Sequence, residues 1–134
     1  MQDLQRQFVP KQVLAGTKMK NEQCAAAFGS VLFYEDQQVI RQLQKKILFH
    51  AAEFPIWSEQ TSGMAQFVVW TALADSGVGA SLQHFNPSID HAAAENFDIP
   101  NTWLLRSQLV FGSIEEEATE RSHAHYQNQF KDYA

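Results

Sequence analysis

The chain has 134 residues, of which 45% are hydrophobic, and a formal net charge of −5. This length and hydrophobic content suit one globular domain over residues 1–134 and exclude a disordered chain. The acidic balance argues against a nucleic-acid-binding protein, because phosphate contacts need clustered lysine and arginine. The one cysteine, Cys24, cannot form an internal disulfide. Residues 1–15 lack the apolar core of a signal peptide, and no apolar run is long enough to span a membrane, so we expect a cytoplasmic protein.

The first third of the chain predicts two helices separated by a strand. Thr17 is a suitable N-cap for a helix over residues 18–27. The apolar run 30–34 is rich in residues of high β propensity and predicts a strand that is buried on both faces. Asp36 is then expected to cap a helix that ends near Lys46.

Residues 57–76 predict the long helix around which the rest of the chain is organised. From Met64 to Ala74 the run is apolar almost without a break and contains no proline. Gly77 suits the left-handed conformation that commonly ends a helix. A helix that is apolar on nearly every side is normally buried on every side, and a small domain cannot cover it alone. We therefore expect a homodimer that forms through residues 57–76.

The second half of the chain predicts shorter elements. A short extended segment begins at Gly79, and its small residues would let the backbone approach something flat. Pro87 is expected to open a helix that ends near Asp98, and residues 103–111 predict a second strand. Helices arranged around a small number of strands indicate an α+β fold.

Three blocks of the sequence resemble, in the same order, segments of the nitroreductase-like flavoproteins. The blocks are SVLFYEDQ, WSEQTSGMAQFVVWTALADSGVGASLQHFNPSID and WLLRSQLVFGSIE, and the resemblance extends from about Phe8 to Arg121. It is closest to the short bacterial and fungal subgroup related to the fatty-acid-repression-mutant proteins. The resemblance implies helices around a small sheet with a long, central, buried helix. Roughly the first third of such proteins has no counterpart in this chain, so we expect a truncated domain.

The resemblance also implies an FMN site. The backbone around Gln83 and His84 would face the N5 edge of the flavin, in a segment that includes Ser81 and Leu82. Arg121 stands where the family has a basic residue that binds the FMN phosphate, and arginine can hold phosphate with two hydrogen bonds. No catalytic side chain is expected, because the flavin supplies the chemistry.

Alternatives to these site assignments stay open when the residues are considered alone. The segment 79–84 could be a buried, strand-like connection, and Arg121 could be a surface arginine among acidic neighbours. Cys24 is expected to be a core residue, because no histidine or basic cluster adjoins it. His123 and His125 form an HxH pair without a third ligand at suitable spacing, so no metal site is predicted.

The function that the resemblance implies is an FMN-dependent oxidoreductase. It would pass electrons from NAD(P)H through the flavin to a nitroaromatic or quinone-like acceptor. The alternative is a truncated, non-enzymatic, dimeric paralogue whose flavin binding is lost or weak. The family's N-terminal segment that grips the phosphate has no counterpart here, so we expect FMN to be held weakly, chiefly through Arg121.

Overall fold

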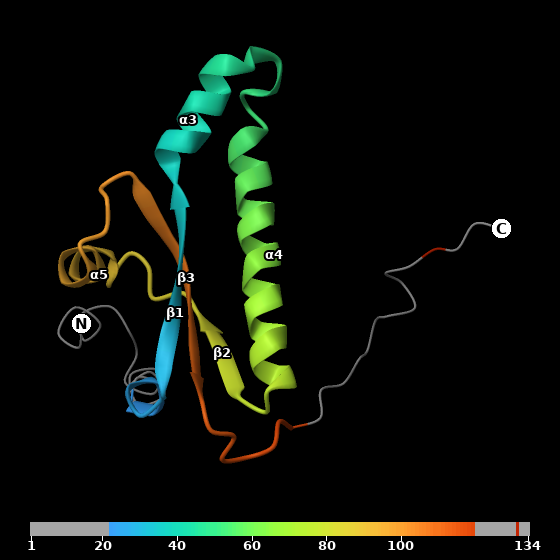
Figure 1. The fold of residues 1–134 in the computed structure, drawn as a ribbon, viewed down its shortest axis with the longest axis vertical. Helices are drawn as coiled ribbons and strands as arrows, with labels where there is room; N and C mark the ends of the chain where they lie inside the picture. The colour runs from blue at the N-terminus through green and yellow to red at the C-terminus, as the bar shows by residue number, and fades with distance from the viewer. Residues whose placement is uncertain (1–21, 120–130, 132–134) are drawn as a thin grey trace, which may run out of the picture.

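The computed structural model describes residues 22–119 and residue 131, and it has an α+β fold (Figure 1). Three antiparallel strands form one sheet in the order β1-β3-β2. The elements in chain order are β1 (Gly29–Asp36), α3 (Gln37–Lys46), the short 3-10 helix η1 (Leu48–His50), α4 (Phe54–Asp75), β2 (Gly79–Gln83), α5 (Asp90–Phe97) and β3 (Trp103–Gly112). Figure 1 shows α4 along one side of the sheet and α5 on the other side. The α+β prediction is thus confirmed.

The central strand β3 holds most of the core. It pairs with β1 from Gly29↔Phe111 to Asp36↔Trp103 and with β2 from Gly79↔Gly112 to Gln83↔Gln108. Its apolar residues Leu105, Leu109 and Val110 are buried, and so are the polar residues Ser107 and Gln108. The strand predicted over residues 103–111 is therefore confirmed.

The predicted strand over residues 30–34 is present in β1, but its burial was predicted wrongly. Most residues of β1 are half-buried, and Glu35 is its one buried residue. The reason is that β1 lies at an edge of the described sheet, where one neighbouring strand and one helix cover it.

Helix α3 has the boundaries that its end residues predict. Asp36 is the N-cap, and its carboxylate accepts a hydrogen bond from the backbone N–H of Gln38 at 2.9 Å. Lys45 and Lys46 occupy the last turn, where positive charge interacts favourably with the helix dipole.

Helix α4 is long and central, as predicted, but it is not buried. Pro55 lies in its first turn, and Gly77, at a φ of 72°, follows its end. None of its 22 residues is buried within the described part of the chain, because the sheet and α3 cover only one of its sides. Despite its length, α4 does not qualify as a membrane span, and neither does any other helix among the described residues.

The segment between β2 and β3 departs from its predicted boundaries. The extended segment pairs as a strand only as far as Gln83. Helix α5 begins at Asp90 rather than at Pro87, after a turn that follows a cis Asn86–Pro87 peptide bond. It ends at Phe97, close to the predicted end near Asp98, and the C-cap residue Asp98 adopts the left-handed conformation.

Candidate functional site

Strand β2 presents an open edge, and the segment that follows it carries the candidate site. In the described sheet, β2 has β3 on one side and no strand on the other. The backbone N–H of Phe85 points toward β3, where it donates to Gln108 Oε1 at 2.8 Å. Successive residues of an extended strand direct their backbone groups to opposite edges. By extending this alternation one residue past the end of β2 at Gln83, we infer that the N–H of His84 points away from β3, toward the open edge.

The four sequence-predicted residues of this segment differ in what their side chains can reach. Gln83 is only 4% exposed, and its Nε2 donates to Ser81 Oγ at 2.7 Å. Leu82 is half-buried and pairs with Leu109, whereas Ser81 and His84 are exposed. Because the Gln83 side chain is used within the chain, the groups available to a ligand are the backbone donors and the side chains of Ser81 and His84.

The small size of Gly79 has a steric cause within the fold. A Cβ atom at Gly79 would lie 3.0 Å from Cγ1 of Ile114 and 3.5 Å from the carbonyl oxygen of Gly112. The glycine therefore makes room for the chain that leaves β3. The predicted close approach of a ligand to this segment stays a prediction, for which the open edge at residues 80–84 is available.

The side-chain amides of Gln108, which is buried on β3, and of Asn86, which is half-buried after β2, form a cluster that sequence reasoning missed. Gln108 Nε2 donates to Asn86 Oδ1 at 3.0 Å, while its Oε1 accepts from Phe85. Asn86 Nδ2 in turn donates to the Leu105 carbonyl at 2.8 Å and to Asp90 Oδ1 at 2.9 Å. A signal was present in the sequence, since Gln108 belongs to a short polar stretch inside a mainly apolar strand.

A second polar cluster joins the other side of the sheet to α4. Ser58 Oγ donates to Glu35 Oε1 at 2.6 Å, and Arg106 Nε donates to Glu35 Oε2. Arg106 also reaches Glu59, with 2.9 Å between the guanidinium nitrogen and the carboxylate oxygen. A β-bulge between Phe33 and Tyr34 leaves Arg106 as the extra residue of β3.

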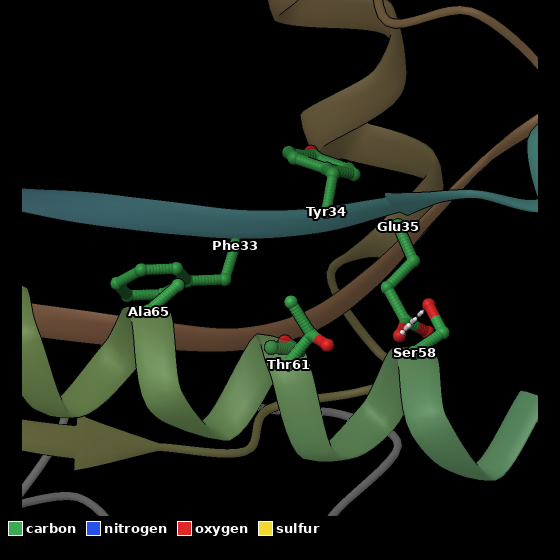
Figure 2. A pocket seen from close by; sticks show the side chains of 7 residues that line it. Phe33, Tyr34, Glu35, Ser58, Thr61 and Ala65 are labelled. Atoms are coloured by element: carbon green, nitrogen blue, oxygen red, sulfur yellow. Dashed lines mark hydrogen bonds between the residues drawn. The ribbon is translucent and has the colours of Figure 1, made fainter.

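This second cluster borders a cleft between β1 and α4. Figure 2 shows Phe33 and Glu35 pointing toward α4, and Tyr34 pointing to the opposite side of the strand. The cleft has a volume of about 240 Å³ and is lined by Phe33, Tyr34, Glu35, Ser58, Thr61, Ser62 and Ala65. Both carboxylate oxygens of Glu35 are already bonded within the chain. The cluster therefore connects elements of the fold and is a poorer candidate for ligand binding than the β2 edge.

The chain is similar to nitroreductases in both sequence and structure, although no family model matches it. It is 39% identical over 109 residues to nitroreductase FRM2 of Saccharomyces cerevisiae, a match that covers 78% of this chain and 55% of the relative. The structure of nitroreductase CinD from Lactococcus lactis in complex with nicotinic acid is 43% identical, with a TM-score of 0.83, and the match covers 99% of this chain and 71% of that one. The chain belongs to the nitroreductase family.

Other members of the nitroreductase family give the same picture. CinD in complex with 4-nitrophenol is 46% identical at a TM-score of 0.83, over 91% of this chain and 65% of that one. The putative nitroreductase HBN1 of Saccharomyces cerevisiae is 40% identical over 99 residues, which are 74% of this chain and 50% of the relative. The chain thus spans about half the length of these yeast nitroreductases. The resemblance to the fatty-acid-repression-mutant subgroup is confirmed.

Several residues singled out in the sequence of this nitroreductase-family chain lie elsewhere. Arg121, His123 and His125 fall outside the described residues. Cys24 is half-buried and free. Within residues 22–119, histidine, cysteine and acidic side chains nowhere gather in the groups of three or more that a metal ion would need.

Proposed function

We propose that the chain carries an FMN-dependent oxidoreductase of the nitroreductase type, with the flavin ring against the open edge of β2. The observation that carries the proposal is the hydrogen bond from the Phe85 N–H to Gln108 just beyond the end of β2 at Gln83, from which we infer that the intervening His84 N–H points outward. A flavin needs donors at the N5 and O4 edge of its ring, since its reactivity depends on hydrogen bonding there. A fixed peptide N–H meets that need without any titrating side chain.

The residues at this edge fit a flat heterocycle. The inner edge of β2 is occupied by β3, so the outward amide of His84 is available to an acceptor. Ser81 and His84 are exposed beside it and can contact the rim of a ring. FMN, when bound, would supply hydride transfer between a nicotinamide cofactor and an acceptor. We assign the FMN phosphate to Arg121, by resemblance to the family.

Ligands of the related structures support the proposed substrate classes. CinD has been solved with 4-nitrophenol and with chloramphenicol, and both compounds carry a nitroaromatic ring. It has also been solved with nicotinic acid, whose pyridine ring resembles the nicotinamide of NAD(P)H. We propose nitroaromatic or quinone-like acceptors and NAD(P)H as electron donor, in a cytoplasmic protein.

The proposed function includes a homodimer formed through residues 57–76. The side of α4 away from the sheet carries exposed Met64, Phe67 and Val68. Exposed apolar residues grouped in this way mark interaction surfaces, and a second copy of the chain offers the same surface.

Substitutions at His84 test the assignment of the ring site. His84→Pro removes the backbone N–H and is expected to weaken FMN binding about tenfold, the value of one net hydrogen bond. His84→Ala is the matched control, since it keeps the N–H and removes only the imidazole, and is expected to change the affinity less than about threefold. The measurement is a flavin fluorescence titration of the full chain.

Two outcomes of this titration would overturn the proposal. Equal effects of His84→Pro and His84→Ala would mean that the backbone donor does not contact the flavin. Failure of the wild-type chain to bind FMN would favour the non-enzymatic alternative.

A further inference from the structure

We propose that Gln108 and Asn86 are positioning residues that hold the His84 backbone N–H toward the open edge of β2. As far as it concerns FMN, the inference rests on the proposed function. Neither side chain would touch the flavin. Both act through the backbone of the two residues that follow His84.

Gln108 fixes the chain at the point where the β2–β3 ladder ends. Its last backbone pair with β2 is the pair with Gln83. The side chain of Gln108 is 2% exposed and extends the pairing further, because its Oε1 accepts the Phe85 N–H at 2.8 Å. His84 therefore lies between Gln83, which is the register partner of Gln108, and Phe85, which is hydrogen-bonded to the Gln108 side chain.

Asn86, the residue after Phe85, is held by three hydrogen bonds of its own side chain. It accepts from Gln108 Nε2 at 3.0 Å and donates to the Leu105 carbonyl at 2.8 Å and to Asp90 Oδ1 at 2.9 Å. These bonds connect the segment to β3 and to the first residue of α5. The side chain of Asn86 thus makes, beyond the end of the strand, the contact with β3 that a paired backbone would make within it.

The cost of burying the Gln108 amide, which the half-buried Asn86 helps to satisfy, argues for a role beyond packing. A buried side-chain amide needs partners for its donors and its acceptor, and an unpaired one destabilises the fold. Leucine or valine would fill a buried strand position without that risk. What the amides add is direction, and a binding group must be held within about 10–20° of its productive orientation. The peptide group whose direction they fix is the one that contains the His84 N–H, which faces the open edge of β2.

The first experiment measures this bond in the FMN-free, full-length chain. Gln108→Met keeps the side-chain length and removes the acceptor of the Phe85 N–H. We expect amide hydrogen exchange at Phe85, followed by NMR, to become about tenfold faster. Gln44→Met is the control, because the half-buried Gln44 also uses its side-chain amide to bond a backbone group, the carbonyl of Ala51 at 2.8 Å, but from α3. It is expected to leave exchange at Phe85 unchanged.

The second experiment measures the cofactor site itself. We expect Gln108→Met and Asn86→Ala to weaken FMN binding about tenfold and to shift the visible absorption band of the flavin at saturating FMN. A purely structural role would lower the melting temperature and leave that band unchanged. If Gln108→Met does not fold, Gln108→Glu replaces it, since its carboxylate still accepts from Phe85 but cannot donate to Asn86. It is then expected to preserve slow exchange at Phe85 and still shift the band.

Each result decides a separate statement. Unchanged hydrogen exchange at Phe85 in Gln108→Met would show that the Gln108 side chain does not hold the Phe85 N–H. Fast exchange there in Gln108→Glu would show the same. Faster exchange with unchanged FMN affinity and an unchanged absorption band would overturn its role at the cofactor site. A wild-type chain that binds no FMN would refute the proposed function and the flavin part of this inference, while the exchange measurements would still decide whether Gln108 holds Phe85.

Discussion

At the scale of single residues, the hydroxyl of Tyr34 is buried without a hydrogen bond that would offset the cost of removing it from water. Its ring lies 6.0 Å from that of Trp103, and its buried hydroxyl has no hydrogen-bond partner among the described residues. Burial raises the pKa of Tyr34 above its ordinary value of 10.0, and the carboxylate of Asp90 raises it further. The folded state thus favours the neutral phenol. The contribution of the neutral Tyr34 to the free energy of unfolding is fully present below the pKa that Tyr34 has in the unfolded chain. It is lost as the pH rises from there through the pKa of Tyr34 in the folded chain.

Tyr34→Phe removes that hydroxyl and nothing else. At pH 7 we expect a free energy of unfolding that is unchanged or up to about 1 kcal/mol higher, because an unpaired buried group is lost. Above about pH 10 the wild type should lose stability relative to the variant, since Tyr34 ionises first in the unfolded chain. Urea denaturation of both proteins at the two pH values measures the difference. A constant difference between neutral and alkaline pH would contradict the assigned cause.

At the scale of elements, the sequence predicts best those boundaries that local chemistry sets. Asp36 caps α3 through an atom two residues away, and Gly77 ends α4 through its own backbone conformation. The start of α5 was misplaced because it depends on distant partners. Asn86 is held by residues 19 and 22 positions further along the chain, and no local pattern indicates those bonds.

The candidate site follows the same division. Residues 81–84 could be identified by resemblance, but the direction of their backbone donors depends on pairing with β3, which lies far along the sequence. The polar residues Arg106, Ser107 and Gln108 interrupt an apolar strand, which indicates that polar side chains form specific hydrogen bonds there. What they bind required the structure, because a β-bulge at Arg106 changes which side chains face α4.

Where α4 meets the sheet, two carboxylates share one arginine. Glu35 has a side chain that is 5% exposed, whereas that of Glu59 is 62% exposed, and both bind Arg106. We expect Glu35→Gln to lower the free energy of unfolding by about 2 kcal/mol, because charge-assisted bonds to a buried group are lost. Glu59→Gln should cost less than about 0.5 kcal/mol, since water screens an exposed pair. Equal losses in chemical denaturation would show that burial does not distinguish the two bonds.

At the scale of the whole molecule, the apolar side of α4 is the feature that a single described chain leaves unexplained. Met64 is 61% exposed and Val68 is 65% exposed, and Phe67 lies between them on the same side of the helix. The sequence predicted the apolar character of this helix correctly. It could not show that the sheet covers one side only, because that depends on how many strands lie beneath the helix.

Val68→Glu tests whether a second copy covers that side. In a symmetric dimer each copy of α4 meets the same surface of its partner, so one substitution places two carboxylates in the interface. Burying an unpaired charge costs several kcal/mol, and we expect dimerisation to weaken by roughly a hundredfold or more. Gln42→Glu adds the same charge at an exposed position of α3 and should leave dimerisation unchanged. Sedimentation velocity over a range of concentrations measures both, and a wild type that stays monomeric at micromolar concentration would rule the dimer out.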